Sequence, residues 1–435
     1  MKTARTTACL LLLLLWACPR AAIAIEYSLP DLYRIALERS EKVGIARENV
    51  TFARLEKNRA VAMLLPRLTA FGTRQQYTDD RYNDLDILIQ PKRTDVWGVR
   101  ADQTLSLSLR EFTALSEARN DITRAGHDLD AVRETYLLQV ARSYYGVLMA
   151  TKGLDIAKSN LERVSKYREA ASSRLKVGEI TKTVLLRAES ELSGARSDLV
   201  RAQNALALAR SSLARVAGIE GEYTLREEPF RAAGEAPLTE LKSTAYASRP
   251  ELRSLEEQVR IAGQEVTYAR GAYWPNLSMA GVYQNSDQAP ETLTFNDKSV
   301  YGALSLNFPF FEGGLRVAEV QEAKTRERQA KLQYEDARKS VGMEVESAYL
   351  DLNTRRGQLK FLEDQAAFAR DNYRGVSRQF ELGLASSIDV IDANDLLVSS
   401  ERQLAEALYS YQLSILSLEQ ATGTFMKGVD APSKT

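Results

Sequence analysis

Two short stretches decide the fold: RLKVGEITKTVLL at residues 174–186 and QFELGLASSIDVI at residues 379–391. In each, text with a helical pattern is interrupted by one glycine and a following hydroxyl residue, after which the helical pattern resumes. Glycine readily ends a helix in the left-handed conformation, and serine or threonine can cap the helix that follows. The chain is therefore predicted to form two sharp helical hairpin tips, at residues 177–181 and 382–386.

The two tips belong to an internal duplication with an offset of 205 residues, which is the separation of Gly178 and Gly383. The segment VARSYYGVL, which holds Tyr144, matches VESAYLDL, which holds Tyr349, at the same offset. Self-similarity at a fixed offset indicates a repeated structural unit. Each half is predicted to contain a helix, a proline, a strand segment, a long helix, a glycine turn and a second long helix.

The long helices are predicted by a three-four spacing of apolar and small residues that continues for about four heptads after each tip. The first series is Leu185, Ala188, Leu192, Ala195, Leu199, Ala202 and Leu206, and the second is Val390, Ala393, Leu397, Ser400, Leu404, Ala407 and Tyr411. Such a seam is typical of coiled-coil packing. No proline interrupts residues 108–173, so the first long helix is predicted to approach about 100 Å in length.

The text of residues 67–107 and 276–310 instead predicts two β-hairpins. RLTAFGTRQQY, VWGVRADQTLSLSL, NLSMAGVYQN and SVYGALSLNFPF alternate with a period of two, and the turn-forming stretches TDDRYND and NSDQAPE separate the members of each pair. Strands of roughly ten to twelve residues can cross a bilayer at a tilt. Because unpaired backbone groups are costly in hydrocarbon, four such strands need other copies of the chain to close their edges. Three copies would supply a closed sheet.

The first 24 residues read as a secretory signal peptide. Lys2 and Arg5 precede an apolar core, and a small-residue cleavage pattern ends at Ala24. The alternative is a lipoprotein signal in which Cys18 is acylated. Cys9 and Cys18 are the only cysteines of the chain, so a mature chain beginning after Ala24 would have no disulfide and no thiolate metal site.

Composition and charge favour neither an enzyme nor a nucleic-acid-binding protein. The 58 basic and 58 acidic residues balance to a net charge of 0, so the overall charge does not suggest a nucleic-acid partner. His127 is the single histidine, and the chain has no phosphate-binding glycine loop. We therefore predict no catalytic residues, no cofactor and no metal site.

The whole mature chain resembles the TolC-like outer-membrane efflux protein family. The resemblance rests on the duplication, on LPDLYRIALERSEKV at the mature start, on LPRL and WPNL before the strands, on FPFFEGG before the second long helix, and above all on ELGLASSIDVIDANDLL. It implies a homotrimer in the outer membrane of a Gram-negative bacterium, in contact with outer-membrane lipid and extending into the periplasm. It also implies an exit duct for an inner-membrane pump that is joined through a periplasmic adaptor (membrane fusion) protein.

One junction departs from the family pattern. The first half has QTLSLSLREF where the second half has FPFFEGGLRV. The glycine-rich corner between strand and helix is therefore missing from the first half, and the sequence does not decide the form of that junction.

The predicted fold class is mainly α with a small β part. Duplicated long helical hairpins would form a trimeric α-barrel, and each chain would contribute four strands to a 12-stranded transmembrane β-barrel. The chain is predicted to divide into a signal peptide (1–24), first-half periplasmic helices (25–66), a first transmembrane β-hairpin (67–107), a first long helical hairpin (108–218), an equatorial linker segment (219–246), a second-half periplasmic helix (247–275), a second transmembrane β-hairpin (276–310), a second long helical hairpin (311–423) and a C-terminal tail (424–435).

The resemblance implies that the adaptor docks at the two tips. The residues concerned are Val177, Gly178, Ile180, Thr181, Leu382, Gly383, Leu384 and Ser386. The four apolar members of this set would be unusual at an exposed tip unless a partner covered them. The alternative is ordinary hairpin packing, with these side chains directed inward.

Asp389 and Asp392 follow the second tip at a spacing that puts them on one helix face. Ser386 and Asp389 can also form a capping box. The resemblance implies that both aspartates line a narrow periplasmic aperture, where three chains would present six carboxylates that favour cations. The matching positions in the first half are Val184 and Arg187, so the acidic gate is predicted at one tip only.

Two functions are compatible with these patterns. The first is a passive export duct of an efflux or type I secretion system. The alternative is a periplasmic coiled-coil adaptor or scaffold without a membrane barrel. Fractionation separates them, because the duct is expected in the outer membrane as a heat-sensitive trimer.

Overall fold

The computed structural model describes residues 25–292 and 296–430. The predicted signal peptide, with the choice between cleavage after Ala24 and acylation of Cys18, lies outside the described residues. The chain divides into two units. Of the described residues, the tip unit holds 25–41, Arg133–Glu240 and 345–430, and the sheet unit holds those of 42–132 and 241–344.

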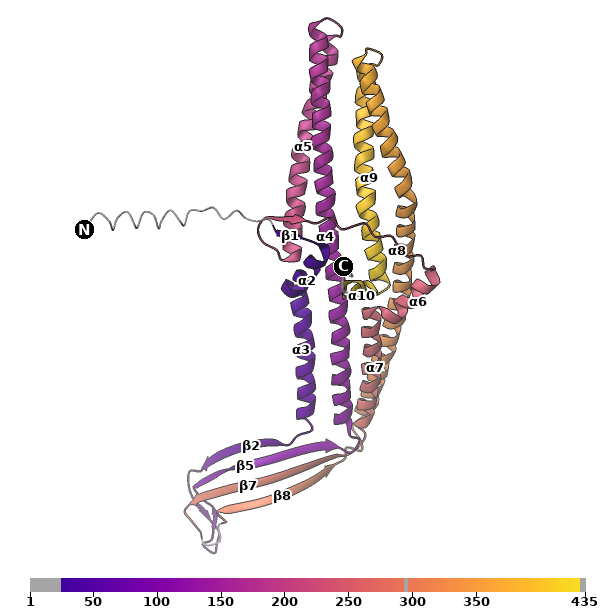
Figure 1. The fold of residues 1–435 in the computed structure, drawn as a ribbon. Coiled ribbons are helices and arrows are strands. Elements are labelled where there is room, and N and C mark those ends of the chain that lie inside the picture. Colours follow the sequence, from indigo (N-terminus) through magenta and orange to yellow (C-terminus); the bar gives the residue numbers. More distant parts are fainter. Residues whose placement is uncertain (1–24, 293–295, 431–435) are drawn as a thin grey trace, which may run out of the picture. The chain divides into compact units, whose positions relative to one another are not determined.

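The duplicated helical hairpins are present in the structure, as predicted. Helices α4 (Arg110–Lys176) and α8 (Leu315–Glu381) have 67 residues each. Each turns at its tip into a shorter helix, α5 (Lys182–Ala217) or α9 (Ser387–Ala421), as Figure 1 shows. The starts of α4 and α8, and those of α5 and α9, all keep the offset found in the sequence. Duplication has therefore preserved the starts of these helices to the residue.

The corners that lead into α4 and α8 have the same backbone shape in spite of their different sequences. Gly313 and Gly314 precede α8 with φ values of 58° and 89°, and Leu109 precedes α4 with a φ of 56°. Leu109 occupies the position that matches Gly314. The first-half junction, whose form the sequence left open, is therefore built in the same way, with leucine in a conformation that ordinarily favours glycine.

The core of the tip unit lies where the first hairpin meets the N-terminal helix α2 (Leu29–Arg39). Leu32, Leu137, Tyr144 and Leu213 are fully buried there. The short C-terminal helix α10 (Phe425–Asp430) joins the same core, with the Phe425 ring edge-on to Tyr33 at 5.9 Å. Burial of such large side chains holds the base of the hairpins together.

Two short strands in the tip unit were not predicted. Strand β1 (Ile25–Tyr27) pairs in parallel with β6 (Tyr223–Leu225). The predicted linker at 219–246 thus contains β6 and the first part of helix α6 (Leu238–Ser248). Strands of three residues carry too little periodic pattern to be recognised from sequence.

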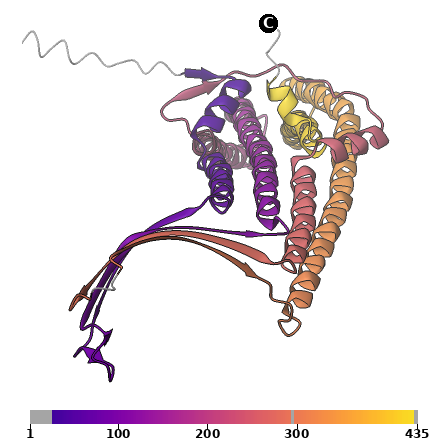
Figure 2. The same cartoon turned by 90° about the horizontal axis from the view of Figure 1, so that it is seen from below.

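The sheet unit contains a four-stranded antiparallel sheet with the strand order β2-β5-β7-β8. The strands are β2 (Arg67–Gln76), β5 (Arg93–Ser106), β7 (Asn276–Ala289) and β8 (Lys298–Asn307). The central pairing joins β5 of the first half to β7 of the second. Figures 1 and 2 show the four strands side by side in one curved layer. No helix in the described part of the chain is long and apolar enough to cross a membrane.

Two of the predicted turns are shorter than expected. The stretch TDDRYND contains β3 (Arg81–Tyr82), which pairs with β4 (Leu88–Gln90). The stretch NSDQAPE lies largely within β7, which continues to Ala289 because it pairs with β5 along its whole length. Long-range pairing has overridden the local turn propensity of these residues.

The sheet has one apolar and one polar face. Its register places Ala70, Val99, Tyr283 and Val300 in one row across the four strands. Leu68, Trp97, Met279, Leu304 and Leu306 share that face, whereas Thr69, Arg100, Gln284 and Ser299 are on the other. Because side chains alternate along a strand, the weak period-two pattern of the sequence becomes a clear division between two surfaces.

The helices of the sheet unit are α3 (Glu41–Ala62) and α7 (Pro250–Gly271) together with the beginnings of α4 and α8. Polar side chains hold α7 to α4. Gln264 donates to Ser116 at 2.8 Å and accepts from Asn120 at 3.0 Å. These bonds place the half-buried Glu117 of α4 against α7, opposite Glu265.

Candidate functional site

The first tip ends α4 with a pair of backbone hydrogen bonds around Gly178. The amide of Gly178 donates to the Leu175 carbonyl, and the amide of Glu179 donates to the Arg174 carbonyl, both at 3.0 Å. Gly178 has a φ of 80°, the left-handed conformation that such a termination requires. The predicted turn is therefore formed by the glycine that the sequence identified.

The predicted cap of the first tip is only partly realised. Thr181 occupies the position before α5, but its side chain caps no backbone amide. Its hydroxyl instead shares a hydrogen bond with that of Thr183 at 2.7 Å. The capping role predicted for Thr181 is therefore wrong, because a neighbouring hydroxyl competes for its side chain.

The second tip repeats the turn and completes the cap. Gly383 has a φ of 78°, and the amide of Leu384 donates to the Gln379 carbonyl at 2.8 Å. Ser386 and Asp389 form a reciprocal capping box. The amide of Ser386 donates to Asp389 Oδ2 at 2.7 Å, and the amide of Asp389 donates to Ser386 Oγ at 3.3 Å. The start of α9 is thus fixed more firmly than that of α5.

The apolar residues of the tips divide into two groups. Val177, Leu382 and Leu384 are 70%, 63% and 77% exposed. Ile180 instead packs against the cluster that contains Tyr167 and Phe380. The expectation of an exposed Ile180 is therefore wrong, and three apolar side chains remain available at the tips of the described chain.

The two tips lie side by side at one end of the tip unit, as Figure 1 shows. Arg174 of the first hairpin donates through Nη1 to the Phe380 carbonyl at 2.8 Å. Its guanidinium also lies 5.0 Å from the centre of the Phe380 ring and binds Glu179 at 2.9 Å. One arginine therefore connects the last turn of α8 to the end of α4.

Asp389 and Asp392 are both exposed on the first two turns of α9. The hydrogen bonds from Ser386, its side chain first and its backbone amide next, lower the pKa of Asp389. This carboxylate therefore stays ionised while it caps the helix. Asp392 has no part in the capping box, which leaves its carboxylate free for a role outside helix termination.

A third aspartate extends the acidic face and was missed by the sequence reasoning. Partial burial and the charge of Asp392 raise the pKa of Asp395, whereas Arg187 of α5 opposes that shift. The signal was present, since Asp395 repeats the three-residue spacing between Asp389 and Asp392. The structure thus brings Arg187, the first-half counterpart of Asp392, close enough to influence the acidic face.

A buried polar connection between the hairpins was also missed. Asn394 of α9 donates to Asn160 Oδ1 at 2.8 Å and accepts from Arg163 Nε at 2.9 Å. The Arg163 guanidinium lies 5.7 Å from the centre of the Tyr373 ring. These partners are more than 200 residues apart in sequence, so no local pattern could have identified them.

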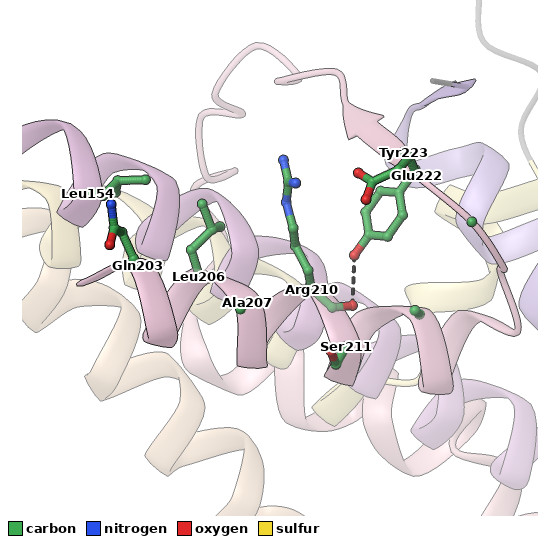
Figure 3. Close-up of a pocket in the computed structure, with 10 residues that line it drawn as sticks. Leu154, Gln203, Leu206, Ala207, Arg210, Ser211, Glu222 and Tyr223 are labelled. Atoms are coloured by element: carbon green, nitrogen blue, oxygen red, sulfur yellow. Dashed lines mark hydrogen bonds between the residues drawn. The ribbon is translucent and has the colours of Figure 1, made fainter. Parts of the chain in front are cut away.

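A separate hollow of about 480 Å³ lies beside the base of α5, and Figure 3 shows its lining. Leu154, Leu206 and Ala207 contribute apolar surface, and the Tyr223 hydroxyl donates to the Arg210 carbonyl at 2.8 Å. Arg210 and Glu222 supply the charged groups of this lining. Such a lining holds no arrangement for acid-base or nucleophilic chemistry. In the described part of the chain, no group of three or more metal-ligating side chains is arranged around a common point.

Comparisons with known proteins agree on one family. The model of the outer membrane efflux protein family matches residues 32–219 and 241–424. Outer membrane protein TolC of Vibrio cholerae is 24% identical over 344 residues, which cover 77% of this chain and 78% of TolC. Alkaline protease secretion protein AprF of Pseudomonas aeruginosa is 23% identical over 413 residues, which cover 89% of this chain and 82% of AprF.

Solved structures give the same result for the fold. The outer membrane channel CmeC of Campylobacter jejuni superposes with a TM-score of 0.81 at 17% sequence identity. The match covers 91% of this chain and 86% of CmeC. The predicted fold class, mainly α with duplicated helical hairpins and a small β part, is confirmed by this agreement.

Proposed function

The chain belongs to the outer membrane efflux protein family, whose members are outer-membrane channels and not enzymes, and on this premise we propose that it is the trimeric exit duct of a tripartite efflux or type I secretion system. The duct conducts passively the substrate delivered by an inner-membrane pump and a periplasmic adaptor protein. It leads this substrate through the periplasm and the outer membrane.

The observation that carries this proposal is the incompleteness of the four-stranded sheet. Among the described strands, β2 pairs only with β5 and β8 pairs only with β7, so each outer strand offers an open edge. An open edge in hydrocarbon would leave backbone groups unpaired at several kcal/mol each. Three copies joined edge to edge close a barrel of twelve strands. Its apolar face then meets lipid and its polar face lines the lumen.

The long helices support the same association. Phe361 and Phe368 of α8 are 74% and 72% exposed, and Leu208 of α5 is 73% exposed. A single chain in water would leave these large side chains hydrated, which favours their burial against a further copy. A head-to-tail ring of three chains buries all of them with one repeated interface.

The acidic face of α9 suits the aperture of such a duct. Asp389 and Asp392 from three chains place six carboxylates around one axis, in a field that attracts cations and repels anions. The capping bond of Asp389 is compatible with this role, because a carboxylate that caps a helix keeps its charge. Asp395 adds a third ring one turn further along α9.

The two tips form the docking surface for the adaptor in this proposal. Val177, Leu382 and Leu384 supply exposed apolar contacts, and Gly178 and Gly383 keep the turns narrow. In the same proposal, Ile180 packs inside the first tip, and Thr181 and Ser386 occupy the positions before α5 and α9. The name of AprF connects one relative to secretion, so efflux and type I secretion both remain within the proposal.

Fractionation and interface variants test this function. We expect the wild-type chain in the outer-membrane fraction, migrating as a trimer on unheated gels and as a monomer after heating. Phe361→Asp combined with Phe368→Asp should abolish the heat-sensitive trimer, because charge is placed in an apolar interface. Gln365→Asp, at an exposed position of the same helix, is the matched control and should leave the trimer intact.

A monomer in the soluble periplasmic fraction would contradict the duct. That result would favour the adaptor or scaffold alternative, which has no need of the four-stranded sheet. The duct accounts for the exposed apolar face of the sheet, where Leu68, Val300 and Leu304 are 73%, 77% and 71% exposed, because lipid would cover that face.

A further inference from the structure

A groove close to the second tip, formed by α8 and α9 with α4 of the first hairpin, is lined by four arginines. Arg163 of α4 and three arginines of α8 line it, together with Leu397 of α9. We propose that this groove receives a helix of the periplasmic adaptor whose acidic side chains repeat every four residues. The inference rests on the proposed function and adds the chemistry by which the partner is recognised.

The three arginines of α8 form a stripe along the helix. Arg370, Arg374 and Arg378 follow one another at intervals of four residues, which places them one turn apart on one side. Their side chains are 50%, 75% and 73% exposed. A neighbouring helix with carboxylates at the same interval would place one carboxylate opposite each arginine of the stripe.

The present partners of these arginines leave two of them available. Arg370 binds Glu401 at 3.0 Å, which connects α8 to α9. Arg374 binds Asp371 at 3.3 Å and Arg378 binds Glu381 at 2.9 Å, both within α8. Exposed pairs of this kind contribute little in water. Arg374 and Arg378 can therefore exchange these contacts for carboxylates of a partner at small cost.

The floor of the groove offers a further donor. Arg163 donates through Nε to Asn394 at 2.9 Å, while its Nη2 atom is buried with no hydrogen-bond partner among the described residues. A buried donor without a partner is unfavourable, and an acidic side chain entering the groove would satisfy it. Leu397 also lines the groove but is only 2% exposed, so recognition in the groove is mainly polar.

The charge of the groove sets it apart from the rest of the chain. Its lining holds four arginines against Glu381 and Glu401, whereas the whole chain has a net charge of 0. The first hairpin has Ser165, Glu169 and Ser173 at the positions that match the stripe. The stripe thus belongs to one hairpin only, and it provides a way for a partner to distinguish two tips of the same shape.

Two synthetic helical hairpins test the recognition directly on the purified full-length trimer. One carries glutamates at three positions spaced by four residues, and the other carries lysines at the same positions. Wild type should bind the glutamate hairpin about tenfold more tightly at low salt, with the preference reduced at high salt. Arg374→Glu combined with Arg378→Glu should remove or invert the preference.

A matched control and the natural partner complete the experiment. Arg196→Glu combined with Arg201→Glu reverses two exposed charges on α5 and should leave the preference unchanged. The adaptor of the same system should bind the Arg374 and Arg378 variant about tenfold more weakly than wild type.

The outcomes separate this inference from the proposed function. Equal binding of the adaptor by wild type and by the Arg374 and Arg378 variant would overturn the inference while the duct stands. Equal affinity of wild type for the two synthetic hairpins would overturn it as well. A wild-type trimer that bound no adaptor would remove both the proposed function and the partner named here.

Discussion

The two tips of this chain share one backbone and differ in their chemistry. Both end a long helix at a glycine with φ near 80°, Gly178 at 80° and Gly383 at 78°. The first tip continues through Thr181, which caps nothing with its side chain. The second continues through Ser386 and Asp389, which form a full capping box. Turn geometry has been kept in both copies, whereas the polar side chains around it have diverged.

The difference shows how a duplicated protein can keep its shape and still divide its functions. A left-handed glycine satisfies the end of a helix with backbone atoms alone, so side chains near the turn are free to change. In the second hairpin, the side chains near the turn include the aspartates of α9 and the arginine stripe of α8. The first has Val184 and Arg187 in place of the acids. We therefore expect variants of the second tip to alter conduction and partner binding more strongly than matched variants of the first.

The largest expected effect is on ion conduction. Asp389→Ala combined with Asp392→Ala should raise single-channel conductance several-fold in planar bilayers, or abolish block by polyvalent cations. The reason is that six carboxylates would leave the aperture. Val184→Ala in the first hairpin is the matched control and should change neither quantity. Unchanged conductance together with unchanged block would remove the gate assignment.

Single variants sharpen the same comparison. Asp392→Asn removes a carboxylate that caps nothing, whereas Asp389→Asn also disturbs the start of α9. If the negative charge at the aperture controls cation block, Asp392→Asn should reproduce a substantial part of the double variant's effect on that block. An effect confined to Asp389→Asn would assign the result to helix capping instead.

The next prediction concerns how stability depends on pH. It compares Glu117 of the first half with Glu322, its counterpart in the second half. Burial, and then the charge of Glu265, raises the pKa of Glu117 to about 7, whereas Glu322 is exposed and binds Arg326 at 2.5 Å. In the unfolded chain Glu117 releases its proton near its ordinary pKa of about 4.3. Between that value and 7 the folded state binds more protons, so stability falls as pH rises through this window.

Thermal unfolding of the solubilised protein checks this expectation. Glu117→Gln should raise the unfolding temperature by about 1–3 °C at pH 8 and change it little at pH 4.5, where the folded carboxyl is already protonated. Glu322→Gln should produce no such pH-dependent gain. A gain of equal size at both pH values would mean that the charge of Glu117 is not the cause.

A smaller effect is expected from the caps themselves. Ser386→Ala should destabilise the start of α9 by about 1 kcal/mol, the usual contribution of a capping side chain. Hydrogen exchange at the amide of Asp389, which donates to Ser386 Oγ, should then accelerate about fivefold. Thr181→Ala should leave exchange at the start of α5 almost unchanged. Equal acceleration at both tips would show that Thr181 caps its helix in the assembled protein.

The features that could be predicted from sequence are the ones with local physical signals. Gly178 and Gly383 were identifiable because a single glycine interrupts a regular three-four pattern, and the pattern itself identified the long helices. The capping box of Ser386 was identifiable because its two members are three residues apart. The position of the acidic face on α9 followed from the same short spacing.

The features that escaped prediction depend on partners remote in the chain. The bond between Arg163 and Asn394 joins residues 231 positions apart. The extension of β7 to Ala289 depends on its pairing with β5. The exception is Thr181, which fails to cap because its hydroxyl has a bond to the nearby Thr183, and nothing in the sequence decides between these two bonds. Tertiary contacts have overridden local preference at the other two places.

The smallest expected effect lies at the junctions that precede the long helices. Leu109, with a φ of 56° and with 54% of its surface exposed, adopts a left-handed conformation where the second half has Gly314. Such a conformation costs about 1–2 kcal/mol for an ordinary residue, while a new glycine adds roughly 0.5–1 kcal/mol of chain entropy to the unfolded state. Leu109→Gly should therefore stabilise the protein by at most about 1 kcal/mol, and Gly314→Ala should destabilise it by a similar amount. Thermal dissociation of the trimer on unheated gels measures both variants, and a clear loss of stability in Leu109→Gly would mean that the leucine side chain is buried by another copy of the chain.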